Sequence, residues 1–134
     1  MNYARLYPRF WLAYFVLLVC VSAYNAIFEL VRATTGESSI TGLLGVLFGA
    51  VALLPMYGYA RQRVATPRWL SMVILVVSGM SIAGATLVVL PVAAQHGFAA
   101  PVIAAIATIA SALPYLFGVY QYCFRSPHIW QHAT

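Results

Sequence analysis

Residues 69–124 form a run of 56 residues that contains no Asp, Glu, Lys or Arg. A single α-helix of that length would measure about 84 Å, whereas the hydrocarbon core of a bilayer is about 30 Å thick. The run must therefore turn back on itself. Residues 90–101 hold Pro91, Pro101, Gly97 and the polar pair Gln95–His96, and we predict the turn there.

Two further uncharged runs precede this one, so the sequence predicts four membrane-crossing helices. We place them at about residues 9–31, 41–60, 69–89 and 100–124. The composition agrees, because 63% of the residues are apolar and only 7% are charged, against about a quarter in soluble domains. The predicted fold is an all-α, integral membrane four-helix transmembrane bundle that forms a single membrane domain over residues 1–134.

The arginines are distributed unequally between the two predicted faces of the membrane. The face with both termini and the central loop holds Arg5, Arg9, Arg61, Arg63, Arg68 and Arg125, and the other face holds Arg32 alone. Cytoplasmic loops of membrane proteins carry the excess of basic residues, so we expect both termini in the cytoplasm. Trp11, Trp69 and Trp130 fall on the same face, where an interfacial aromatic belt is expected.

One polar stripe is predicted on the outer half of the first helix. Ser22, Asn25, Glu29 and Arg32 are spaced three, four and three residues apart, which places them on one helical face. An ionisable group inside a membrane span is a functional candidate by default. The alternative is that Glu29 lies at the outer interface, where water and Arg32 satisfy it. We favour this structural interpretation, because the cost of a charge falls steeply towards the interface.

Small residues recur at the spacing of close-packed membrane helices. Gly45 and Gly49, Gly79 and Ala83, and the series Ala104, Thr108, Ala112 each line one face. We expect these faces to pack helices together, either inside the chain or between protomers.

The sequence offers no chemistry that points to an enzyme or to a bound cofactor. It has no phosphate-binding loop, no Cys-x-x-Cys and no paired carboxylates. His128 and His132 are four residues apart, but a closed Zn site needs four ligands and no further ligand is evident. We therefore predict no catalytic residue, no cofactor and no metal. The arginines lie at the ends of apolar runs, which indicates membrane topology and no nucleic-acid partner.

The central loop and the tail resemble a family of small bacterial inner-membrane proteins with four predicted spans and unknown function. The residues that carry the resemblance are Arg61-Gln62-Arg63 with Pro67-Arg68, then Tyr122, Ser126 and His128-Ile129. The resemblance implies a multi-pass protein of the bacterial inner membrane and supplies no activity.

Three functions fit this architecture. The favoured one is a non-enzymatic accessory subunit that contacts the lipid bilayer and either another membrane protein or further copies of itself. The second is an oligomeric small transporter or channel, because four spans enclose a pathway only when protomers associate. The third is an immunity protein against a membrane-targeted toxin, which fits the size but depends on no particular residue.

Overall fold

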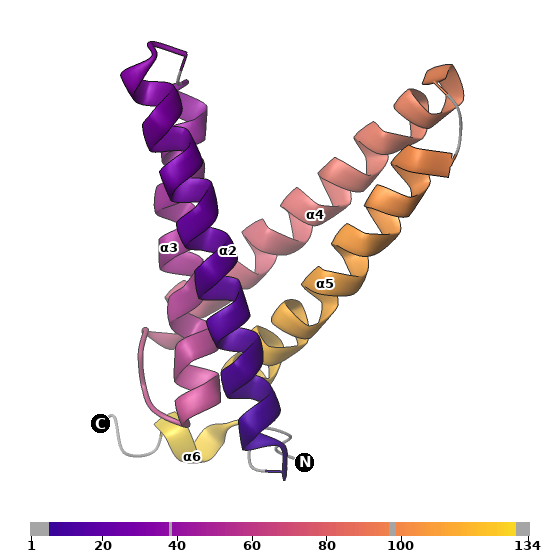
Figure 1. Cartoon of the computed structure of the whole chain (residues 1–134). Helices are drawn as coiled ribbons and strands as arrows, with labels where there is room; N and C mark the ends of the chain where they lie inside the picture. Colours follow the sequence, from indigo (N-terminus) through magenta and orange to yellow (C-terminus); the bar gives the residue numbers. More distant parts are fainter. Residues whose placement is uncertain (1–5, 38, 97–98, 131–134) are drawn as a thin grey trace. The chain divides into compact units, whose positions relative to one another are not determined.

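The computed structural model describes residues 6–37, 39–96 and 99–130, and their regular structure is entirely helical. Four long helices follow one another: α2 (Pro8–Thr34), α3 (Ile40–Arg61), α4 (Arg68–His96) and α5 (Ala99–Phe124), with the short α6 (Pro127–Trp130) after them (Figure 1). The four long helices are long and apolar enough to cross a membrane. The predicted all-α class with four candidate spans is therefore confirmed.

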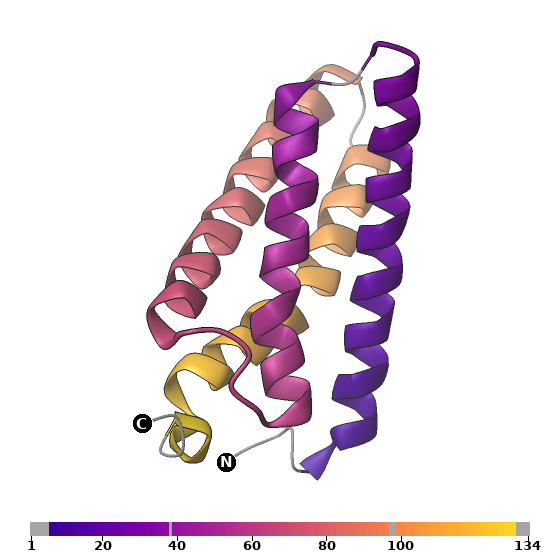
Figure 2. The same ribbon diagram turned by 90° about the vertical axis from the view of Figure 1, so that its left-hand side faces the viewer.

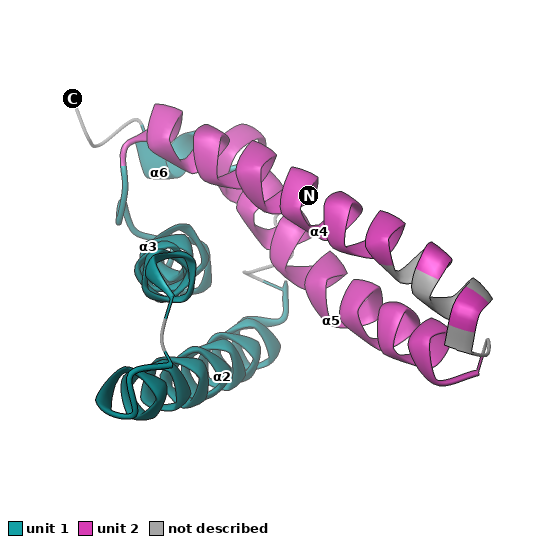
Figure 3. Cartoon of the chain, turned by 90° about the horizontal axis from the view of Figure 1, so that it is seen from above, with its two compact units in different colours: residues 1–66, 126–134 teal, residues 67–125 magenta. Residues whose placement is uncertain are grey.

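The helices form two compact units, each built on an antiparallel pair (Figure 3). Unit 1 comprises residues 1–66 and 126–134, in which α2 packs along α3 and α6 follows at the tail. Unit 2 comprises residues 67–125, in which α4 packs along α5. Figure 2 shows α2 and α3 side by side from a second direction. The assembly of the two pairs into one four-helix bundle and a single membrane domain stays a prediction.

The connection between α2 and α3 is short because both helix ends are closed locally. Gly36 adopts φ +77°, and the Gly36 and Glu37 amides donate to the carbonyls of Ala33 (3.2 Å) and Arg32 (2.9 Å). These are the two hydrogen bonds of a Schellman motif, which satisfies the last carbonyls of a helix. On the other side, the Ser39 hydroxyl caps α3 by accepting from the Gly42 amide at 3.0 Å.

The end of α3 uses the same pair of backbone bonds without a glycine. The Gln62 and Arg63 amides donate to the carbonyls of Tyr59 (3.3 Å) and Gly58 (3.0 Å), and Gln62 adopts φ 54°. A left-handed conformation costs a non-glycine residue roughly 1–2 kcal/mol. The Gln62 amide group offsets this cost, since its Nε2 donates to the Tyr59 carbonyl at 2.6 Å and its Oε1 lies 2.7 Å from His128 Nε2 in α6.

The third helix is longer than its predicted span. The candidate span in α4, Arg68–Val88, lies close to the predicted residues 69–89. We expected a turn to begin near residue 90, but α4 continues through Pro91 to His96. Proline removes its own amide bond to the carbonyl four residues earlier and its ring crowds that carbonyl, but membrane helices tolerate both effects. The polar pair Gln95–His96 thus ends a helix of 29 residues, about 44 Å long, which exceeds the hydrocarbon thickness.

Aromatic residues fix the register of unit 1. The Trp11 and Tyr59 rings meet edge to face, with centroids 5.0 Å apart and planes at 79°, and the Phe15 and Tyr57 rings lie 5.5 Å apart. Tyr59 and Met56 are fully buried and Trp11 is 4% exposed. The indole of Trp11 thus packs on Tyr59 of α3, and its place at the membrane interface stays a prediction.

We expect Gly36→Ala to lower the stability of unit 1, because a side chain at φ +77° costs roughly 1–2 kcal/mol. Nothing lies within 4 Å of the position that a Cβ would occupy, so the cost is conformational and not steric. Thermal unfolding in mild detergent, followed by circular dichroism, measures it. An unchanged midpoint would contradict the Schellman closure; Gly45→Ala, in the interior of α3, serves as the control.

Candidate functional site

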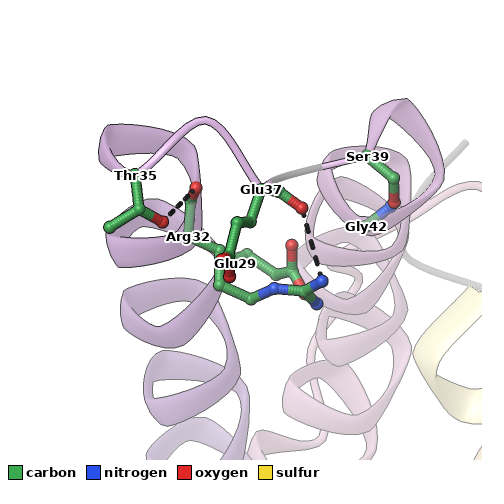
Figure 4. A network of polar contacts seen from close by, with 6 residues as sticks. All are labelled: Glu29, Arg32, Thr35, Glu37, Ser39 and Gly42. Atoms are coloured by element: carbon green, nitrogen blue, oxygen red, sulfur yellow. Dashed lines mark hydrogen bonds and ion pairs between the residues drawn. The ribbon is translucent and has the colours of Figure 1, made fainter.

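The polar cluster at the α2–α3 turn is the only place in the described residues where charged side chains of opposite sign meet (Figure 4). Arg32 Nη1 lies 3.2 Å from Glu29 Oε1, and Arg32 Nη2 donates to the Glu37 carbonyl at 3.3 Å. The guanidinium also lies over the Phe28 ring, 5.8 Å from its centroid. One arginine therefore connects the last turn of α2 to the loop that follows it.

The ion pair is only partly shielded from its surroundings. The Arg32 side chain is 41% exposed and the Glu29 side chain is 17% exposed. A pair with one exposed partner is worth at most about 1 kcal/mol in water. Its main effect is to neutralise Glu29 where α2 leaves the apolar part of the hairpin.

The second oxygen of Glu29 faces the first turn of α3. Glu29 Oε2 is buried and has no hydrogen-bond partner among the described residues. It lies against Gly42, where an added Cβ would come within 2.8 Å of Glu29 Cδ and 3.2 Å of Oε1. Gly42 is the third residue of α3, so the carboxylate lies near the positive end of that helix, which favours a negative charge. The missing side chain at residue 42 makes this approach possible.

The predicted polar stripe is divided by the structure. Ser22 faces α3, because its Oγ lies 3.7 Å from the Cβ position of Gly49, and Glu29 faces Gly42 one heptad further on. Asn25 is exposed and lies outside this contact. Two of the four residues of the stripe, Ser22 and Glu29, therefore lie against glycines of α3, and Arg32 contacts Glu29.

Sequence reasoning missed Gly42 as a partner of Glu29. A sequence signal for this contact exists. Ser22 and Glu29 are seven residues apart, and so are Gly42 and Gly49, and residues at equal spacings on two antiparallel helices can face one another in pairs. Of the predicted pair Gly45 and Gly49, only Gly49 lies against α2, because nothing lies within 4 Å of a Cβ at residue 45. The same is true of Gly79, and Ala83 is exposed. Packing through these faces stays a prediction.

Unit 2 contains a small cavity of about 80 Å³ lined by Ala85, Thr86, Ala104, Ala105 and Thr108. The hydroxyls of both threonines donate to carbonyls of their own helices, Thr86 to Ile82 and Thr108 to Ala104, each at 2.8 Å. Both hydroxyl hydrogens are therefore already used within the helices, and the lining of the cavity is mainly apolar.

The remaining predicted residues lie at the helix ends. Arg61 and Arg63 are exposed, Trp69 is 66% exposed and Trp130 is half-buried. Arg68 lies over the Phe124 ring, 5.9 Å from its centroid.

The histidine pair of the tail is described only in part. His128 contacts Gln62 as given above, and His132 lies outside the described residues. In the described part of the chain no three His, Cys, Asp or Glu side chains form a group that fits a metal ion.

No protein-family model, curated protein or solved structure matches the chain. What defines its class is the fold itself: four helices have the length and apolar composition of the spans of a multi-pass helical membrane protein.

We expect an alanine at residue 42 to act through Glu29. The atoms that its Cβ meets belong to the end of a flexible side chain, so the carboxylate moves away and the α2–α3 backbones stay in place. Gly45→Ala gains roughly 0.5–1 kcal/mol of helix propensity without a contact. Gly42→Ala should therefore be less stable than Gly45→Ala by about 1 kcal/mol.

The same comparison in a Glu29→Ala background provides the control. Without the carboxylate, the two alanine variants should have nearly equal unfolding midpoints in detergent. If the difference between them is unchanged when Glu29 is absent, Glu29 does not lie against Gly42.

Proposed function

We propose that this protein is a non-enzymatic accessory protein of the bacterial inner membrane, which binds another membrane protein or further copies of itself. One observation carries the proposal: some small residues of α3 and α4 are not covered by the other helix of their own hairpin. A Cβ at Gly45 in α3, or at Gly79 or Gly84 in α4, would meet nothing within 4 Å.

Open glycines are significant in lipid for a physical reason. Lipid chains are as apolar as leucine, so membrane helices associate through close packing and not through the hydrophobic effect. A glycine on an outward face lets a second backbone approach closely. Phe48, three residues after Gly45 and on the same side of α3, is exposed and apolar, and such a surface fits a neighbouring helix.

The polar cluster supports a structural role for Glu29 in this proposal. One oxygen of its carboxylate is paired with Arg32 and the other lies against α3. A proton or ion carrier would need this carboxylate to exchange partners, whereas an assembly subunit needs it only to fix the hairpin.

We further propose that both termini and the central loop lie in the cytoplasm, with the α2–α3 turn outside. The support is the ratio of six arginines to one between the two faces. Single cysteines at Ser39 and Val64, in a Cys20→Ala, Cys123→Ala background, test this topology. A membrane-impermeant maleimide added to intact cells should label residue 39 and spare residue 64. The reverse pattern would contradict the proposed orientation.

Partner binding is tested by Gly45→Leu. A leucine at this position fills the open face, but meets no atom of its own hairpin, so the fold and thermal stability should persist. We expect the wild type, purified in mild detergent, to carry a stoichiometric membrane protein or a second copy, and Gly45→Leu to lose it.

Ala50→Leu, at an exposed alanine of α3 that lies about 140° around the helix from Gly45, provides a control substitution to the same residue away from the face of Gly45. Recovery of the wild-type chain alone, as a monomer, would contradict the proposal. So would solute flux through liposomes that contain only this protein, because flux would indicate a transporter.

A further inference from the structure

Three exposed arginines gather at one end of unit 1. Arg9 is the second residue of α2, Arg61 is the last residue of α3, and Arg63 follows two residues later. Because Trp11 packs on Tyr59, Arg9 lies level with the end of α3. Figure 1 shows the start of α2 and the end of α3 at the same end of the pair.

No acidic side chain of this protein can balance these charges. The sequence contains two acidic residues, Glu29 and Glu37, and both belong to the α2–α3 turn at the opposite end of the pair. Arg32 contacts both residues, through the Glu29 carboxylate and the Glu37 carbonyl. The turn end of the hairpin thus has a formal charge of −1, from Glu29, Glu37 and Arg32, whereas the other end has positive charge with no acidic side chain beside it.

Helix electrostatics explain only part of this pattern. A cation at the C-terminus of a helix is favourable, which accounts for Arg61. Arg9 lies in the first turn of α2, where the helix dipole disfavours a cation and no acidic residue is present. An anion bound beside Arg9 would offset this unfavourable interaction with the helix dipole.

The surroundings of the three arginines indicate what kind of anion this is. Tyr7 (62% exposed), Phe10 (54%) and Val64 (46%) lie beside them in the sequence and present apolar surface at the same end. A free inorganic anion, such as phosphate, would leave this apolar surface in water. A phospholipid supplies both a phosphate for the guanidinium groups and glycerol and acyl groups for the neighbouring rings.

We infer that Arg9, Arg61 and Arg63 form a binding site for the headgroups of anionic phospholipids at this end of unit 1. Guanidinium groups bind phosphate oxygens in a bidentate manner, and each basic residue near a membrane surface adds about fivefold to the affinity for anionic lipid. The inference is independent of the proposed partner binding. It depends on the charged end of the hairpin, whereas partner binding depends on the open glycine faces of the helices.

The test uses the full chain in neutral detergent at physiological salt. Dioleoyl phosphatidylglycerol or dioleoyl phosphatidylcholine is titrated in, and the thermal unfolding midpoint is followed. We expect phosphatidylglycerol to act at a concentration at least about tenfold lower than phosphatidylcholine. The triple variant Arg9→Gln, Arg61→Gln, Arg63→Gln should lose this preference, and the corresponding triple lysine variant should retain most of it.

Single substitutions of equal charge complete the design. Arg63→Gln should weaken the preference by about fivefold, whereas Arg32→Gln, at the other end of the hairpin, should leave it unchanged. If the triple variant does not fold, these single variants still test the proposed lipid site. Equal effects of the two lipids on the wild type, or equal losses in the two single variants, would overturn the site. A stabilisation by inorganic phosphate as large as that by phosphatidylglycerol would overturn its assignment to lipid.

Discussion

A polar group left without a partner in hydrocarbon costs several kcal/mol, and this cost governs how the chain is built. The backbone meets the constraint by remaining helical across each span, even at Pro55, Pro91 and Pro114. The side chains meet it by bonding locally, as the hydroxyls of Ser81, Thr86 and Thr108 do with carbonyls of their own helices. The one carboxylate that belongs to a long helix is Glu29, and the first hairpin is arranged around it.

The hairpin accommodates Glu29 by combining a local ion pair with a distant glycine. Arg32 is one turn away on the same helix and neutralises one oxygen at 3.2 Å. Gly42 belongs to the next helix and leaves the space that the other oxygen occupies. The Schellman closure at Gly36 and the Ser39 cap keep the loop short enough for the two helices to meet in this register.

The number and approximate position of the spans could be predicted because apolar length is a local property of the sequence. The pair formed by Glu29 and Arg32 could be predicted for the same reason, since three residues separate them. The contact of Glu29 with Gly42 and the burial of Trp11 against Tyr59 were not predicted, because each depends on the register between two helices, for which the matching seven-residue spacings are only a weak signal. The end of α4 was placed too early because proline was given more weight than the tolerance of membrane helices allows.

The central claim is that α2 and α3 pair in one register, with Ser22 opposite Gly49 and Glu29 opposite Gly42. Disulfide crosslinking in native membranes tests it most directly, with Cys20 and Cys123 replaced by alanine. The pair Ser22→Cys, Gly49→Cys should crosslink readily, because Ser22 Oγ lies 3.7 Å from the Cβ position of residue 49. The pair Ser22→Cys, Gly45→Cys should crosslink poorly, since nothing lies within 4 Å of a Cβ at residue 45. Equal or faster crosslinking through residue 45 would contradict this register.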